Sequence, residues 1–198
     1  CSIHGQPVGK AGGDFAKTVV HLGGNPDEPF QILPEVADYY AKKLAEKAEY
    51  AKQRKAEDTA WAAQHPEMAE KLQKFLTNDF EFPDMSGLDF SKPTATRSAS
   101  GKVLGALYGK VENLVVSSAD LSNSDNTNGY LAKTKAFTNG DFSGAFLQAG
   151  VCELSMAALC CGMALHGGVF PLCGTFFVFS DYIQPVLRVA ALMNNTMI

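Results

Sequence analysis

The chain has 198 residues, 46% of them hydrophobic, and its 17 basic and 21 acidic residues give a formal net charge of −4. The apolar fraction excludes an intrinsically disordered chain, and the acidic balance excludes a polybasic nucleic-acid binder. After residue 135 the charged residues are few, namely Asp141, Glu153, Asp181 and Arg188. A region so poor in charge is expected to be buried in a core, in a subunit interface or around a ligand.

Residues 1–33 are rich in glycine and show no apolar period, which predicts a loop that follows something upstream. Pro34 is placed to open a helix that we expect to run to about residue 63. A second helix is predicted over residues 66–76, because Pro66 disfavours helix in the residue before it. Residues 80–95 contain prolines and a glycine and are expected to form a linker.

The pattern then changes to alternating helices and strands. We expect helices over 97–111, 152–166 and 175–193, strands over 113–117 and 169–173, and a polar loop over 118–144. This order predicts an α/β fold with a parallel sheet. It stops where a further strand should begin, and we therefore expect three parts, an N-terminal loop (1–33), a helical linker (34–95) and an incomplete α/β domain (96–198).

Neither the apolar runs nor the cysteines point to a membrane or to secretion. The run Leu154–Leu165 has 12 residues and is too short to span a bilayer, and no N-terminal segment resembles a signal peptide. No CxxC spacing suggests a zinc site among the five cysteines, which predict buried, reduced thiols: Cys1, Cys152, Cys160, Cys161 and Cys173. We expect a cytoplasmic protein with no membrane or nucleic-acid partner.

A few polar and aromatic side chains are candidates for chemistry, each with a structural alternative. Glu153 heads an apolar helix and is either a functional acid or a first-turn glutamate that meets the helix dipole. Phe176, Phe179 and Tyr182 either pack a core or stack on a flat ligand. Arg97 begins a helix and either binds a phosphate or is merely exposed.

The motifs around these residues, taken together, resemble the transketolase family. The resemblance spans essentially the whole chain in ordered segments. They are Ile3–Gly9, Pro34–Val36, Thr96–Ser98, Ser118–Leu121, Gly140–Gly144, Gly150–Ala158, Gly162–Gly168 and Gly174–Tyr182. Transketolases transfer a two-carbon ketol unit between sugar phosphates with thiamine diphosphate and a divalent metal, Mg or Ca, in the pentose phosphate pathway.

The resemblance implies roles for individual residues around the cofactor. Glu153 matches the glutamate that hydrogen-bonds N1′ of the aminopyrimidine and so promotes loss of the thiazolium C2 proton. Phe179 matches the aromatic residue stacked on the pyrimidine ring, and Phe176 and Tyr182 match its neighbours. Asp120 matches an acidic residue on the thiazolium side of the cofactor.

Further residues match positions that contact substrate. Arg97 and Ser124 match the groups that hold the sugar-phosphate tail, and His4 matches a histidine that contacts both the cofactor diphosphate and the substrate. In the family the active site lies between the subunits of a homodimer. The resemblance also makes residues 1–33 the end of the diphosphate-binding domain, and residues 96–198 the start of the pyrimidine-binding domain.

This sequence departs from the family pattern beside the glutamate, where Cys152 and Leu154 replace the usual residues, and also at Val116, Ser117 and Cys173. The motif that binds metal and diphosphate and the histidine-rich substrate segment are both absent. We therefore expect a central fragment of a transketolase that holds no metal site, and that alone neither binds the cofactor tightly nor is active. A related thiamine-diphosphate transferase, such as dihydroxyacetone synthase or phosphoketolase, and a non-catalytic dimerisation partner remain alternatives.

Overall fold

The computed structural model of the protein describes residues 4–79 and 81–196. The chain divides into two compact units, Cys1–Gln64 and His65–Ile198. In the first unit a short 3-10 helix covers Val8–Ala11, and α1 covers Phe15–His21. The expectation that residues 1–33 form only loop is therefore wrong. The Asp14 carboxylate caps α1 by accepting a hydrogen bond from the Lys17 backbone N–H at 3.0 Å, a local signal hidden among the glycines.

Helix α2 extends over Pro34–Gln64, as the sequence predicts, and has no buried residue. Ion pairs between neighbouring turns support it, such as Lys43 Nζ with Glu46 Oε2 at 2.7 Å. Because such exposed pairs contribute little each, helix propensity supplies much of its local stability.

The second unit begins with α3 and continues as an α/β layer. Its elements are α3 (Pro66–Thr77), α4 (Thr96–Leu107), β1 (Leu114–Ser118), α5 (Asn128–Leu131), β2 (Phe146–Gln148), α6 (Glu153–His166), β3 (Phe170–Gly174), a 3-10 turn (Phe177–Phe179) and α7 (Ser180–Leu192). No helix in the described part of the chain is both long enough and apolar enough to cross a membrane.

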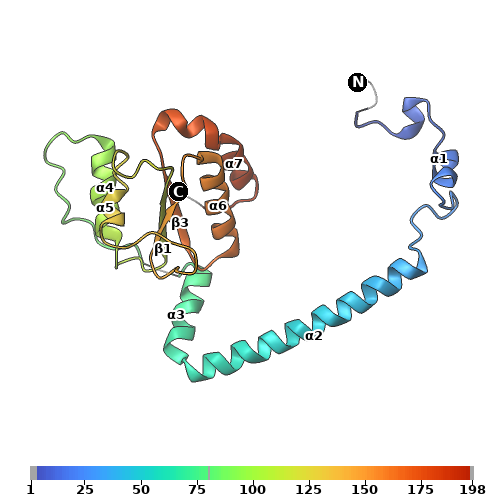
Figure 1. The fold of residues 1–198 in the computed structure, drawn as a ribbon, viewed down its shortest axis with the longest axis horizontal. Helices are drawn as coiled ribbons and strands as arrows, with labels where there is room; N and C mark the ends of the chain where they lie inside the picture. The colour runs from blue at the N-terminus through green and yellow to red at the C-terminus, as the bar shows by residue number, and fades with distance from the viewer. Residues whose placement is uncertain (1–3, 80, 197–198) are drawn as a thin grey trace. The chain divides into compact units, whose positions relative to one another are not determined.

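The three strands form one parallel sheet in the order β2-β1-β3, which confirms the predicted α/β fold. Val116 at the centre of β1 lies opposite Phe146 on β2 and Leu172 on β3. Figure 1 shows α4 and α5 on one side of the sheet and α6 and α7 on the other. The chain thus passes from β1 to its neighbour β2, and then crosses back through α6 to β3 on the other edge of β1.

Side chains of β1 alternate between the two faces of the sheet. Leu114 and Val116 belong to a cluster of buried residues with Leu104, Tyr130 and Phe146 on the α4 side. The Tyr130 hydroxyl donates to the Leu114 carbonyl oxygen at 2.8 Å, and burial raises the pKa of this phenol to about 12. Both faces of the central strand are therefore covered, as parallel sheets require.

Four segments differ from the sequence-based prediction. Helix α4 ends at Leu107 rather than at residue 111. Strand β2, of three residues, was not predicted, and the polar loop over 118–144 contains the single turn of α5. The last helix begins at Ser180 rather than near residue 175, so Phe176 stands on extended backbone before the 3-10 turn. The predicted stripe of aromatic residues is therefore not carried by one helix.

Candidate cofactor and substrate site

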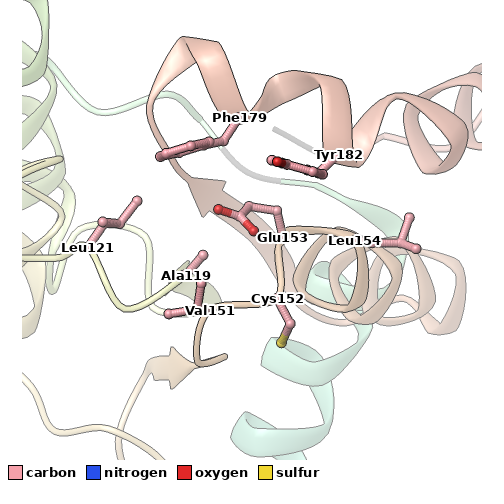
Figure 2. Close-up of a pocket in the computed structure, with 8 residues that line it drawn as sticks. All are labelled: Ala119, Leu121, Val151, Cys152, Glu153, Leu154, Phe179 and Tyr182. Atoms are coloured by element: carbon pink, nitrogen blue, oxygen red, sulfur yellow. The ribbon is translucent and has the colours of Figure 1, made fainter.

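A cleft of about 470 Å³ opens at the carboxyl ends of the strands. It is lined by segments that follow each strand in turn: Ala119 and Leu121 after β1, Val151, Cys152, Glu153 and Leu154 after β2, and Phe179 and Tyr182 after β3 (Figure 2). Because the connection after β1 runs to β2 on the α5 side of the sheet and the connection after β2 returns to β3 on the α6 side, this edge is a topological switch point, the place where open α/β sheets bind ligands.

Glu153 is the acid of this cleft. It is the first residue of α6 and is 9% exposed, and its carboxylate points toward the rings of Phe179 and Tyr182 (Figure 2). No group within residues 4–79 and 81–196 donates a hydrogen bond to this carboxylate. A buried carboxylate is ordinarily paired, and the free lone pairs here suit a donor on a ligand.

The aromatic rings lie in sequence along one wall. The centroids of Phe179 and Tyr182 are 6.2 Å apart with an interplanar angle of 32°, and those of Phe176 and Phe179 are 6.3 Å apart at 40°. Phe179 and Tyr182 line the cleft of Glu153, whereas Phe176 lines a second cavity. An aromatic face beside a carboxylate can hold a flat ring that carries a hydrogen-bond donor at its edge.

The second cavity, of about 670 Å³, lies between the start of α4 and the end of β3. Arg97 and Phe176 both line it. Inside it, the buried Asp125 accepts a hydrogen bond from Ser118 Oγ at 2.8 Å. The hydroxyls of Thr127 and Thr175 are buried and have no hydrogen-bond partner among the described residues. An arginine and unpaired hydroxyls are groups that bind phosphate or sugar oxygens.

The loop after β1 holds two further predicted residues, and neither lines either of these two cavities. Asp120 is exposed and adopts left-handed backbone (φ 63°) between Ala119 and Leu121, which do line the cleft. The Ser124 hydroxyl donates to the Leu121 carbonyl oxygen at 3.1 Å and so supports the loop. Left-handed backbone in a non-glycine residue is uncommon and concentrates at functional sites.

His4 lies in an exposed turn of the first unit, whereas the residues that line the two cavities belong to the second. Within the described ranges, 4–79 and 81–196, no three His, Cys, Asp or Glu side chains gather as metal ligands do.

Several lining residues were not predicted from the sequence as part of the site. Val151, Cys152 and Leu154 simply flank Glu153, so neighbourhood in the chain was the available signal. The Cys152 thiol donates to the Ala149 carbonyl oxygen at 2.8 Å and points away from the rings (Figure 2). Thr127 and Thr175, in contrast, line the same cavity only because of the fold, and no pattern in the sequence marks them as site residues.

Comparison with known protein families matches the chain over both units. Residues 92–198 match the family model described as transketolase, pyrimidine binding domain, and residues 1–81 match transketolase, thiamine diphosphate binding domain. The transketolase of Bacillus subtilis is 34% identical over 195 residues, which is 96% of this chain and 29% of that protein. The transketolase of Treponema pallidum is 37% identical over 196 residues, with the same two coverages.

Solved structures give the same result. A transketolase of Pichia stipitis in complex with sedoheptulose-7-phosphate aligns with a TM-score of 0.72 and 28% identity, over 90% of this chain and 28% of that one. The transketolase of Campylobacter jejuni aligns with a TM-score of 0.66 and 30% identity, over 92% and 27% respectively. The chain therefore spans under a third of the length of the relatives it matches.

Proposed function

The chain belongs to the transketolase family, and from that premise we propose that it supplies the pyrimidine-binding side of a thiamine-diphosphate site that transfers ketol units between sugar phosphates. The observation that carries this proposal is the buried Glu153 carboxylate, which faces the cleft without a hydrogen bond from any described residue. As in the family, the reaction would belong to the pentose phosphate pathway. We also propose that this chain by itself neither binds thiamine diphosphate tightly nor catalyses ketol transfer.

The residues of the cleft fit an aminopyrimidine ring. Such a ring presents a flat π-face, which matches Phe179 and Tyr182, and a polar edge, which matches the carboxylate of Glu153. When bound, thiamine diphosphate supplies a carbon nucleophile at its thiazolium ring. Glu153 would hold or accept a proton at N1′ of the pyrimidine, while the apolar lining excludes water that would compete for this hydrogen bond.

Substrate would be held by groups from the second cavity and the neighbouring loop. Arg97 carries a fixed positive charge at the start of α4, where it would pair with the phosphate of a sugar phosphate. Ser124 and Asp120 lie in the loop after β1, and we assign them to the phosphate tail and to the thiazolium side respectively. His4 would contact both the cofactor diphosphate and substrate.

The metal, Mg²⁺ or Ca²⁺, would neutralise the diphosphate through ligands other than the described residues, which form no group of three metal-binding side chains. We also propose a homodimer. Exposed apolar side chains on α6 and α7 support an interface there, namely Leu154, Leu159, Leu165, Val189 and Leu192. The free cysteines suit the reducing cytoplasm.

Replacing Glu153 with Gln in the whole protein tests the proposal. The amide keeps the size of the side chain but cannot accept a proton, so turnover should fall by a factor on the order of 10² to 10⁴ in a ketol-transfer assay with ribose phosphate as acceptor. Glu67→Gln, the same change at an exposed residue of α3 that lines neither cavity, is the matched control.

Unchanged turnover in Glu153→Gln would refute the proposal and favour a non-catalytic dimerisation partner. Activity of the unaltered protein with formaldehyde or inorganic phosphate, but not with ribose phosphate, would instead indicate a dihydroxyacetone synthase or a phosphoketolase.

A further inference from the structure

Two cysteines that are distant in the sequence meet behind the cleft. Cys160 lies on α6, fully buried, and Cys173 lies on β3 and is partly exposed. Ser117 connects them, because it is the Cα partner of Cys173 in the sheet and its hydroxyl lies 3.4 Å from the Cys160 sulfur. The Cys160 and Cys173 side chains also interact with one another, which shifts the pKa of both thiols. The two thiols therefore face one another across the interface between helix and sheet.

From this contact we propose that Cys160 and Cys173 form a redox modification site, at which a peroxide closes a reversible disulfide between α6 and β3. Neither residue has a role in the function proposed above. The other described cysteines are differently placed. Cys161 points elsewhere, since its sulfur accepts a hydrogen bond from Asn195 Nδ2 at 3.2 Å. Cys152 is exposed, and its thiol is hydrogen-bonded to the Ala149 carbonyl oxygen.

The surroundings favour a reactive thiolate at Cys160. Hydrogen bonding with Cys173, and to a lesser extent with Ser117, lowers the pKa of Cys160 against the opposing effect of burial. The same contact raises the pKa of Cys173, so that this thiol keeps its proton. The pair therefore combines a thiol whose ionisation is favoured with an adjacent thiol that keeps its proton, the arrangement of an attacking and a resolving cysteine.

The reaction balances with one peroxide molecule for each disulfide. The Cys160 thiolate attacks one oxygen of hydrogen peroxide, the O–O bond breaks, and the departing hydroxide takes up a proton to leave as water. Cys160 is then a sulfenic acid. The Cys173 sulfur attacks the Cys160 sulfur, the S–O bond breaks, and hydroxide leaves as a second water with the Cys173 proton. Two thiols are oxidised, one peroxide is reduced, and a low-molecular-weight thiol reverses the step.

The disulfide would act on the cleft through α6. Glu153 precedes Cys160 by two helical turns on the same buried face of this helix, together with Met156 and Ala157. Because a disulfide holds its sulfur atoms about 2.05 Å apart, closer than a hydrogen-bonded pair, its formation draws α6 toward β3. The carboxylate then shifts relative to the aromatic wall, and cofactor affinity falls. This consequence rests on the proposed function, whereas disulfide formation does not.

The test uses the purified protein that contains this chain at its natural length. It is titrated with hydrogen peroxide, quenched with N-ethylmaleimide and digested with chymotrypsin, which cuts between Cys161 and Cys173 at residues such as Leu165 and Leu172. We expect mass spectrometry to show a peptide pair linked through Cys160 and Cys173 that dithiothreitol separates. Cys160→Ser and Cys173→Ser should each abolish the link, whereas Cys152→Ser and Cys161→Ser should keep it.

Absence of this link at peroxide concentrations that oxidise the exposed Cys152 overturns the proposal, as does a link that survives in Cys160→Ser. If a serine variant fails to fold, Cys173→Ala is a second way to prevent the disulfide, and melting curves check that each variant is folded. With the disulfide closed, the affinity for thiamine diphosphate should fall by about tenfold or more; unchanged affinity overturns the regulatory effect alone. Failure of the reduced protein to bind the cofactor contradicts the proposed function instead.

Discussion

The hydrogen bond between Tyr130 and β1 offers a direct measurement of what holds the central strand in place. Tyr130 is 1% exposed, and its hydroxyl donates to the Leu114 carbonyl oxygen at 2.8 Å. Tyr130→Phe preserves the ring and its packing but leaves this buried carbonyl without the phenolic donor. The expected loss of stability is about 1–3 kcal/mol, the cost of an unsatisfied buried polar group.

Because the whole protein has several parts, global unfolding need not be two-state, and a local measurement is preferable. Hydrogen exchange of a peptide covering Leu114–Ser118 reports the opening of β1 itself. A loss of 1–3 kcal/mol corresponds to exchange faster by a factor of about 5 to 150. Tyr108→Phe is the matched control, because the Tyr108 ring packs against Tyr130 at 5.4 Å but is 39% exposed.

The raised pKa of Tyr130 also predicts that β1 loses stability at alkaline pH. Burial raises the pKa of Tyr130 to about 12 in the folded chain, whereas an unfolded tyrosine ionises near 10. A group whose folded pKa is raised contributes stability below its unfolded pKa, and that contribution declines as pH rises from 10 toward 12. The protection of β1 should therefore fall over this window in the unaltered protein and be flatter in Tyr130→Phe. Equal exchange in Tyr130→Phe and Tyr108→Phe at neutral pH would refute the reasoning.

Two further variants probe the packing beneath the site. Ser118→Ala removes the donor to Asp125 and the acceptor for the Leu121 N–H, and should lower thermal stability by about 1–3 kcal/mol. Ser122→Ala is the control and should leave the stability unchanged. Equal melting temperatures of the two variants would contradict the assigned hydrogen bonds. Gly101→Ala would place a Cβ 2.7 Å from the Asn126 carbonyl oxygen and cost about 1–3 kcal/mol. Gly162→Ala is the control, because its new Cβ meets open space on α6, and it should be neutral or stabilising by up to about 1 kcal/mol. A lower melting temperature for Gly162→Ala than for Gly101→Ala would show that α4 does not pack as described.

Elements with strong local signals were predicted within a residue or two. Pro34 and Pro66 mark where α2 and α3 begin, and the apolar run after Glu153 ends at Leu165, one residue before α6 ends. Elements that depend on partners were missed. Strand β2 has three residues and becomes a strand only by pairing with β1, and α5 is a single turn in contact with α4. A short segment of this kind has too few residues for a period to show.

Much the same division applies to the candidate site. The charge-poor last third and its one buried acid, Glu153, were visible in the sequence, because charge and apolar pattern are properties of the chain itself. The sequence also placed Phe179 and Tyr182 near one another, since three residues separate neighbours on one side of a helical turn.

What only the tertiary structure decided is which of these groups share a cavity. Phe179 and Tyr182 line the same cleft as Glu153, whereas Phe176 lines the cavity of Arg97. The reason is that α7 begins at Ser180, later than the spacing of the aromatic residues indicates. The contact of Cys160 with Cys173 follows only from the crossover that places α6 on β1 and β3. The sequence determined the residue types and the local elements, and the fold determined their neighbours, because contacts between distant segments depend on strand order and register rather than on spacing along the chain.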